Sequence, residues 1–186
     1  FNGWTIFEQP HIDSLKPDFV ILHPKRGIII IEVKDWNLSL NLYLSNGMIL
    51  GNDNKLHRKN PVIQVENYKK CISKLDMKTS EDFIENNPQY YGCIETVVYF
   101  HGATIEQAEE FCGKSYNTKI WVDSDIDVIK SNCRLNPKKY TYSLSFKSSK
   151  LNKNGSLEKY VNELIKRLQE KKCINNLQKA ILKNRI

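Results

Sequence analysis

Four successive isoleucines at residues 28–31 place the strongest constraint on the fold of this chain. Isoleucine is β-branched, and an apolar run without polar alternation is typical of a central strand that is covered on both faces. A shorter apolar run at residues 19–22 precedes it, and the turn-rich residues 23–27 separate the two runs. The sequence therefore predicts a β-hairpin whose second strand lies inside a sheet.

This strand ends on charged residues, because Glu32 and Lys34 follow the isoleucines directly. Their side chains project to the same face of a strand, and a charged pair in an apolar setting is costly unless it is paired or functional. The hairpin folds Asp18, at the start of the preceding strand, back toward them. Two carboxylates beside a lysine can hold a hard divalent cation while the ammonium meets a phosphate or an attacking water. The three residues together predict phosphodiester hydrolysis, although each alone would be explained by a surface ion pair.

The remaining pattern predicts an α/β domain with a mixed sheet and helices outside it. Pro61 marks the first turn of a helix, on which Gln64 and Tyr68 share one side. The other elements expected in this region are strands at residues 4–9, 93–100, 119–122 and 140–146, a hairpin of residues 40–44 and 48–50, and a helix at residues 104–112.

The domain organisation follows from one polar stretch, residues 147–155, which is rich in Lys, Ser and Asn. It is the predicted linker, and it divides a core at residues 1–146 from a tail at residues 147–186. Within this tail, residues 157–168 have the apolar spacing of an amphipathic helix. We therefore expect one α/β domain followed by a linker and a helical tail.

Three segments in a fixed order resemble the nuclease-related domain family, a branch of the PD-(D/E)xK nucleases. They are residues 16–22 (KPDFVIL), 27–36 (GIIIIEVKDW) and 60–64 (NPVIQ). Residues 64–68 (QVENY) are similar to the Q-h-x-x-Y element of RecB-like nucleases. The resemblance covers about residues 4–100, and the ordered combination is far more specific than E-x-K alone. It implies a restriction-endonuclease-like core with a mixed central sheet flanked by helices.

This resemblance implies a role for each residue of the constellation. Asp18 and Glu32 would bind Mg²⁺ or Mn²⁺, together with the carbonyl group of Val33. Lys34 would orient or activate the attacking water and stabilise charge on the phosphorane-like transition state. Gln64 would hold the lysine, the water or the phosphate from the facing helix.

Five further residues are predicted to contact nucleic acid. Lys25 and Arg26 lie in the hairpin turn, and Arg58 and Lys59 lie in a basic loop before the Gln64 helix. The alternative for all four is an ordinary solvated charge. Tyr68 either stacks on or contacts the nucleic acid, or packs in the core.

Other residues near the predicted site receive more ordinary interpretations. Trp36 is interpreted as a packing residue despite its nearness to Lys34, and His101 as a turn histidine rather than a general base. Related nucleases often carry another acidic residue on a helix before the first strand, and this chain begins after that point. Glu8 is the candidate that could partly substitute for it.

Bulk properties agree with a nucleic-acid partner. The formal charge of +7, from 28 basic and 21 acidic residues, favours polyanions through phosphate attraction and counterion release. Five widely spaced cysteines without a C-x-x-C pair predict reduced thiols, no zinc site and a cytoplasmic protein. No apolar stretch approaches the roughly 20 residues of a membrane span.

The leading hypothesis is a metal-dependent DNA endonuclease or nickase, linked to a helicase in DNA repair or phage defence. The chain opens at Phe1 without methionine, and residues 177–182 (LQKAIL) resemble the adenine-reading glutamine element of superfamily 1 helicases. We therefore expect a piece of a longer protein. The competing hypothesis is a nucleic-acid-binding module without turnover that positions a motor on DNA, and an RNase or transposon-type resolvase with the same chemistry stays open.

Overall fold

The structure is a computed structural model that describes residues 3–12, 14–73, 91–115, 117–135 and 155–183. Its strands follow the hydrogen-bonded order β1-β2-β3-β7-β8, and a separate small sheet has the order β4-β5-β6. The chain forms two compact units, which are described one at a time. The first unit consists of residues 1–30, 68–94 and 146–186, and the second of residues 31–67 and 95–145.

The first unit contains residues 19–23 and 27–30, which are the first strand of the predicted hairpin and the start of its second, together with a strand at residues 5–8. Strands β1 (Thr5–Glu8) and β2 (Phe19–His23) are antiparallel, with Thr5 opposite Leu22 and Glu8 opposite Phe19. A turn then leads into β3 (Gly27–Lys34), whose first four residues are buried in this unit. The alternation of buried and half-buried residues along β2 follows the period of two that a strand requires.

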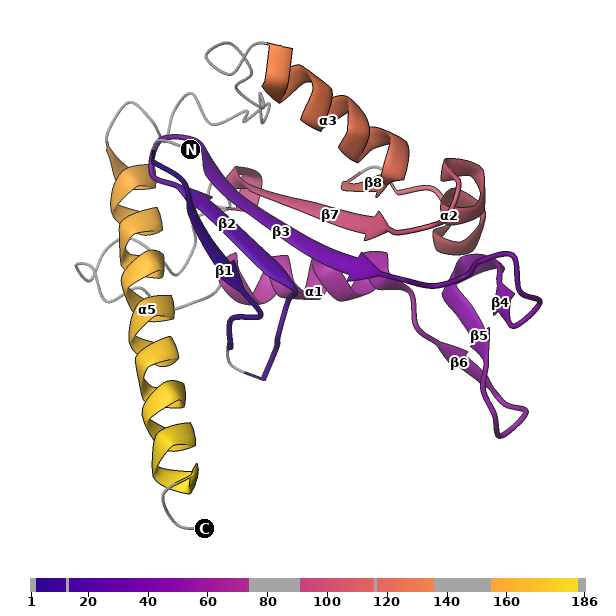
Figure 1. The fold of residues 1–186 in the computed structure, drawn as a ribbon, viewed down its shortest axis with the longest axis horizontal. Helices are drawn as coiled ribbons and strands as arrows, with labels where there is room; N and C mark the ends of the chain where they lie inside the picture. The colour runs from indigo at the N-terminus through magenta and orange to yellow at the C-terminus, as the bar shows by residue number, and fades with distance from the viewer. Residues whose placement is uncertain (1–2, 13, 74–90, 116, 136–154, 184–186) are drawn as a thin grey trace. The chain divides into compact units, whose positions relative to one another are not determined.

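A long C-terminal helix, α5 (Ser156–Lys183), completes the first unit and contacts β2. Figure 1 shows α5 in yellow beside the hairpin. The predicted amphipathic pattern is confirmed, because its apolar positions are buried while Ile165 is half-buried. Those buried positions are Leu157, Tyr160, Val161, Leu164 and Leu168. The Tyr160 hydroxyl also donates to the Ile72 carbonyl oxygen at 2.9 Å and so ties α5 to the end of α1 (Pro61–Ser73).

The second unit contains the end of β3 and two more strands, β7 (Ile94–Phe100) and β8 (Thr118–Val122), which are parallel to each other. The His101 backbone N–H donates to the Lys34 carbonyl oxygen at 2.9 Å, so β3 and β7 end together. Helices α2 (Ile105–Cys112) and α3 (Asp123–Leu135) both contact β8. The fold is therefore mixed α/β, with a five-stranded mixed sheet flanked by helices, as the sequence predicts.

The small sheet of the second unit consists of β4 (Tyr43–Leu44), β5 (Met48–Leu50) and β6 (Leu56–Arg58), with the 3₁₀ turn η1 (Ser45–Gly47) between β4 and β5. The predicted strand over residues 40–44 is shorter than expected. The Leu40 N–H donates to the Asn37 carbonyl oxygen and the Tyr43 N–H to the Leu40 carbonyl oxygen, so turns replace the first part of the predicted strand.

One glycine and one asparagine join this sheet to the helices. Gly47 has a φ of +72°, and a Cβ atom there would lie 2.4 Å from the Asn60 Cβ atom, so a side chain is excluded. The Asn60 side chain accepts a hydrogen bond from Val62 N at 2.9 Å, which caps α1, and donates one to the Cys112 carbonyl oxygen at 2.8 Å. The first turn of α1 is therefore fixed against both the small sheet and α2.

Three features of the chain were either not predicted from its sequence or cannot be compared with the structure. Helix α3 was not predicted from the sequence, and the predicted strand at residues 140–146 lies outside the described residues, as does the 146/147 domain boundary. The short 3₁₀ turn η2 (Tyr91–Cys93) precedes β7. In the part of the chain that the structure describes, no helix has the length and apolarity needed to cross a membrane.

Candidate active site

The end of β3 and the first turns of α1 place three of the predicted residues together. Lys34 Nζ lies 2.5 Å from Glu32 Oε1, and Gln64 Nε2 donates to the same oxygen at 2.7 Å. The side chains of Lys34 and Glu32 are only 13% and 6% exposed. Strand alternation puts Glu32 and Lys34 on one face, and the cap at Asn60 sets the phase of the helix that carries Gln64. The predicted cluster is thus held by two elements.

The second carboxylate oxygen of Glu32 differs from the first in its hydrogen bonding. Glu32 Oε2 is buried, and among the described residues it has no hydrogen-bond partner. An unpaired charged oxygen in such a place is unfavourable, and a bound cation would remove this cost because divalent hard cations take carboxylate oxygens as ligands. The residues present therefore fit a cation ligand at this atom.

Within the second unit, the cluster offers one carboxylate as a ligand for a cation. Among the described residues, no group of three or more His, Cys, Asp or Glu side chains is arranged to hold a metal ion. Val33, between Glu32 and Lys34, is half-buried.

Asp18 lies in the first unit, at a bend directly before β2. Its side chain is half-buried, the preceding Pro17 is buried, and its carbonyl oxygen accepts a hydrogen bond from Gln9 N at 2.7 Å. The backbone is therefore fixed at the position that the sequence assigns to a ligand. Its role as a ligand stays a prediction.

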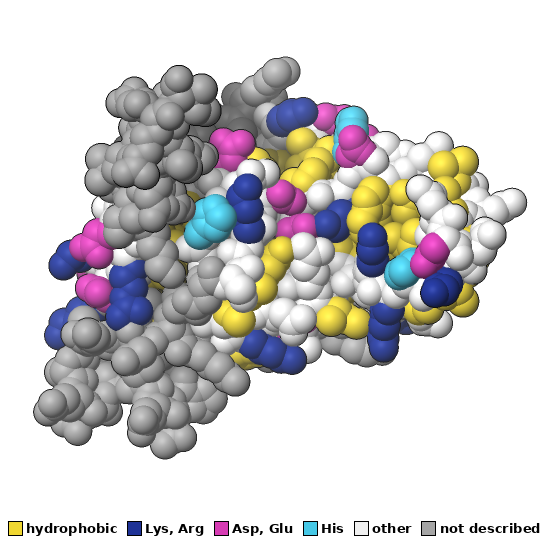
Figure 2. All heavy atoms as spheres, turned by 90° about the horizontal axis from the view of Figure 1, so that it is seen from below, with side chains coloured by type: hydrophobic (Ala, Val, Ile, Leu, Met, Phe, Trp, Pro, Cys, Tyr) yellow, Lys and Arg dark blue, Asp and Glu magenta, His cyan; other side chains and the backbone are white. Residues whose placement is uncertain are grey.

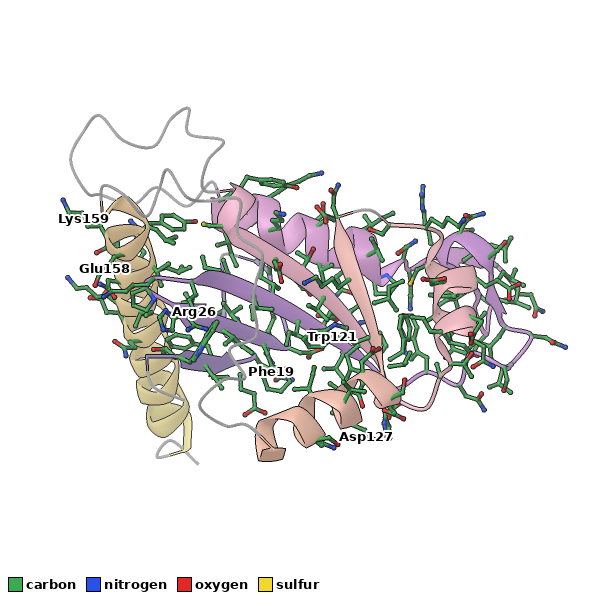
Figure 3. The ribbon with its side chains drawn as sticks, turned by 90° about the horizontal axis from the view of Figure 1, so that it is seen from above. Phe19, Arg26, Trp121, Asp127, Glu158 and Lys159 are labelled. Carbon is green, nitrogen blue, oxygen red and sulfur yellow. The ribbon has the colours of Figure 1, made fainter. Side chains whose placement is uncertain are left out.

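The predicted nucleic-acid contacts have different exposures. Lys25 is exposed and Arg26 half-buried at the turn between β2 and β3, where Figure 3 shows Arg26 on the side on which α5 lies. Arg58 and Lys59 are exposed at the end of β6. Over the described residues that Figure 2 draws, basic side chains are dispersed among acidic and polar ones. The charge is thus spread rather than gathered in one patch on that face.

Tyr68 is 6% exposed and belongs to the core of the first unit. Of its two interpretations, packing is the one that this burial favours, because a stacking residue must present a ring face to its ligand.

A second polar cluster, not predicted from the sequence, lies at the ends of β7 and β8. Asp123 accepts hydrogen bonds from the Tyr99 hydroxyl at 2.5 Å, from His101 Nδ1 at 3.0 Å and from Gly102 N at 3.0 Å. These bonds, first that of Tyr99, lower the pKa of Asp123 to about 2, and the same contact raises the pKa of Tyr99 to about 12. His101 was interpreted as a turn histidine without a role. Its partner Asp123 follows 22 residues later, so the local sequence carries no signal of the pair.

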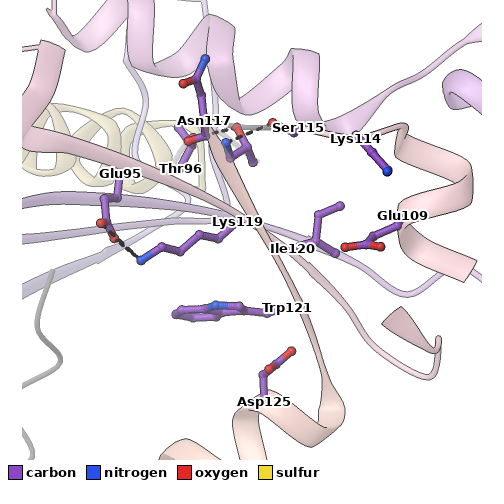
Figure 4. A pocket seen from close by; sticks show the side chains of 11 residues that line it. Glu95, Thr96, Glu109, Lys114, Ser115, Asn117, Lys119, Ile120, Trp121 and Asp125 are labelled. Carbon is purple, nitrogen blue, oxygen red and sulfur yellow. Dashed lines mark hydrogen bonds and ion pairs between the residues drawn. The ribbon is translucent and has the colours of Figure 1, made fainter. Parts of the chain in front are cut away.

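A hollow of about 690 Å³ is lined by β7, α2, β8 and the start of α3, but by none of the three clustered residues. Figure 4 shows Lys119 reaching Glu95, and their charged atoms lie 3.1 Å apart. Trp121 and Asp125 are also part of the lining. Lys119 is thus already paired, while Lys114, which also lines the hollow, is exposed.

The fold and the cluster together define a nuclease-like α/β protein. The sequence profile described as the nuclease-related domain matches residues 1–101, which is more than half of the 186 residues. The chain belongs to the nuclease-related domain family, as its motifs indicated, and its function is nuclease-related. Comparison with curated proteins and with solved structures gives no match.

Proposed function

We propose that this chain is a metal-dependent nuclease that hydrolyses DNA phosphodiester bonds as an endonuclease or nickase. The observation that carries the proposal is the asymmetry of Glu32. One of its oxygens accepts hydrogen bonds from both Lys34 and Gln64. The other oxygen is buried and has no hydrogen-bond partner among the described residues. A carboxylate used only for an ion pair would gain from pairing both oxygens.

Glu32 Oε2 and the Val33 carbonyl group are the proposed ligands of Mg²⁺ or Mn²⁺ in the second unit, and Asp18 is the further carboxylate predicted from the sequence. When bound, such an ion supplies a Lewis acid for the phosphoryl group and lowers the pKa of a bound water. Replacing Glu32 by glutamine would remove the negative charge of this ligand without changing the size of the side chain.

Lys34 is proposed to act directly at the reaction centre, where Gln64 supports it. The Lys34 ammonium group is anchored to Glu32 at 2.5 Å, and the Lys34 side chain is 13% exposed. Because an ammonium has three donors, donors remain for a water or a phosphate oxygen. From there it orients the attacking water and stabilises the negative charge that develops on the phosphate. Gln64 holds the Glu32 carboxylate through its amide and so fixes the anchor of the lysine.

The exposed basic residues are proposed to bind the phosphate backbone. Lys25, Arg26, Arg58 and Lys59 are either exposed or half-buried, and each neutralised phosphate releases counterions. Such contacts position the nucleic acid without selecting its sequence.

A nucleic-acid-binding module without turnover is the second candidate. It is favoured by one observation, the absence among the described residues of a cluster of three potential metal ligands. This module would bind DNA with a strong dependence on salt and would cleave none with any metal.

A cleavage assay separates the two candidates. Supercoiled, linear and single-stranded DNA, with an RNA strand beside them, are incubated with Mg²⁺, Mn²⁺ or EDTA. We expect metal-dependent nicking or cutting that Lys34→Ala abolishes while circular dichroism shows a retained fold. A Lys34→Ala protein as active as the parent would contradict the mechanism, and an inactive parent that binds DNA would establish the second candidate.

The proposed cellular setting is a helicase-linked machine of DNA repair or phage defence. The support is the sequence of residues 177–182, which resembles the glutamine element before the phosphate-binding loop of superfamily 1 helicases. Co-purification of the natural full-length protein with ATPase activity would test this setting.

A further inference from the structure

The indole ring of Trp36 lies against the Lys34 ammonium group. Lys34 Nζ is 5.1 Å from the centroid of this ring, within the distance of about 6 Å at which the negative ring face attracts a cation. Trp36 follows β3 by two residues, and its side chain is half-buried. The ammonium group is therefore held by two contacts, the Glu32 carboxylate and the indole face.

The ring of Trp36 is itself fixed by other aromatic side chains of the second unit. Tyr43 stacks on it with ring centroids 5.7 Å apart and planes at 24°. The rings of Phe111 and Phe100 meet it edge to face, with centroids 5.7 Å and 6.4 Å away. Burial and then Asp35 raise the pKa of Tyr43, so its hydroxyl stays neutral beside this cluster.

These aromatic contacts come from three separate elements. Phe100 ends β7, Phe111 belongs to α2 and Tyr43 begins β4, so three elements converge on the indole ring that follows β3. Offset and edge-to-face contacts of this kind favour one orientation of a ring. The ring face presented to Lys34 is thus set by the packing of the unit and not by local backbone preference.

We propose that Trp36 is a positioning residue for Lys34, and this inference rests on the nuclease function proposed above. A lysine side chain has four rotatable bonds, and it loses conformational entropy when it is held in one geometry. The contact with Glu32 restrains only the end of the lysine side chain. The indole ring restrains the direction from which the ammonium group approaches the Glu32 carboxylate. Trp36 therefore keeps the ammonium at the reaction centre between turnovers. Trp36 packs against other side chains, as its sequence position predicted, and it also orients the lysine.

A purely structural role for Trp36 makes a different prediction. Packing depends on the shape of the ring, while attraction of a cation depends on the electron density of its face. Fluorine atoms on the indole withdraw that density and change the shape little. A series of fluorinated tryptophans therefore distinguishes the two roles within one fold.

The experiment uses the whole chain with a single tryptophan. The sequence has three tryptophans, so Trp4→Phe and Trp121→Phe leave Trp36 as the labelled site. We expect kcat for DNA cleavage to fall stepwise from unlabelled to monofluorinated to tetrafluorinated tryptophan, by roughly 10-fold in total. KM and the melting temperature should stay constant along the series.

Two substitutions extend the test. Trp36→Phe keeps a smaller ring face and should lie between the parent and Trp36→Leu in kcat, because Trp binds cations best among aromatic side chains. Tyr43→Phe is the matched control, since it keeps the stacked ring, and its kcat should equal that of the parent. A kcat that does not change along the fluorination series in an active protein would overturn the positioning role alone.

A spectroscopic arm is independent of cleavage. The ring current of Trp36 should shift the ε-methylene NMR signal of Lys34, which Lys34→Arg identifies, and Trp36→Leu should remove this shift. An unshifted Lys34 signal in the parent would overturn the inference whatever the activity. A parent with the shifted signal that cleaves no substrate would instead overturn the nuclease proposal, and the positioning role with it.

Discussion

Two polar clusters of the second unit lie at strand ends, and they differ in how completely their acid is paired. Glu32 is 6% exposed and leaves one buried oxygen unpaired among the described residues. Asp123 is 45% exposed, and its carboxylate accepts three hydrogen bonds from Tyr99, His101 and Gly102. Saturated exposed acids are usual in proteins, and unsaturated buried ones need an explanation. Glu32 is therefore the acid for which we propose a role in the chemistry, and Asp123 the one for which we propose a structural role.

The two clusters also lie on different faces of the strands. Thr96 of β7 meets Glu66 of α1 through a hydrogen bond of 3.3 Å, so the even-numbered residues of β7 face α1. Tyr99 is odd-numbered and faces away from α1, toward Asp123 at the start of α3. Glu32 binds Gln64 of α1. His101, although its backbone bonds to Lys34, therefore belongs to the structural cluster.

The largest expected effect is that of Glu32→Gln. The amide keeps the shape of the side chain but loses the charge, so we expect kcat to fall by about 10²-fold or more. We also expect Mn²⁺ to raise the melting temperature of the parent and not that of Glu32→Gln. Plasmid cleavage and thermal unfolding with and without Mn²⁺ measure the two effects.

Glu95→Gln is the matched control for this change. Glu95 is also a carboxylate paired with a lysine, at 3.1 Å from Lys119, but in a partly exposed pair. Its loss should leave kcat within about twofold of the parent, because exposed pairs contribute little. Equal losses in the two variants would remove the distinction between the clusters.

Gln64→Ala should have an intermediate effect. It removes one of the two donors to Glu32 Oε1, and hydrogen bonds to charged groups are worth about 1.5–3 kcal/mol. We expect kcat to fall by roughly 10-fold while Mn²⁺ still raises the melting temperature. Loss of the metal response in Gln64→Ala would show that the helix residue is a ligand and not a support.

Asp123→Asn should leave cleavage unchanged and alter only the pH dependence of stability. The folded-state pKa of about 2 lies below the ordinary value of 3.8, so the ionised form stabilises the fold above the unfolded value. That contribution is lost as the pH falls from about 4 through about 2. Acid unfolding of the variant should be flatter than that of the parent in this window, and circular dichroism against pH measures it. An Asp123→Asn protein that folds normally but does not cleave DNA would show that Asp123 is needed for activity.

Glu32 and Lys34 could be predicted together because strand alternation sets them on one face of β3. Gln64, which lies 32 positions after Glu32, was added only through the resemblance to the nuclease-related domain family. The central strand was predictable from the local sequence, since the isoleucine run needs no partner to indicate burial.

The features that could not be predicted from the sequence depend on contacts between residues that are far apart in the chain. Trp36 meets Phe111 of α2, which comes 75 positions later, and no local pattern announces that pairing. Helix α3 has few apolar residues, and one of them, Val128, is 58% exposed. Only its acidic first turn, Asp123 and Asp125, was a usable signal.

The contact between Gly47 and Asn60 has a consequence for variant libraries. Asn60 caps α1, and its carbonyl oxygen also accepts a hydrogen bond from Gln64 N at 3.2 Å. A bulky residue at position 47 would push on Asn60 and so on the backbone of Gln64. In a deep mutational scan scored by activity, Gly47 would tolerate as few substitutions as a residue that touches the substrate. A map of intolerant positions would therefore include residues, such as Gly47, that support the proposed site without belonging to it.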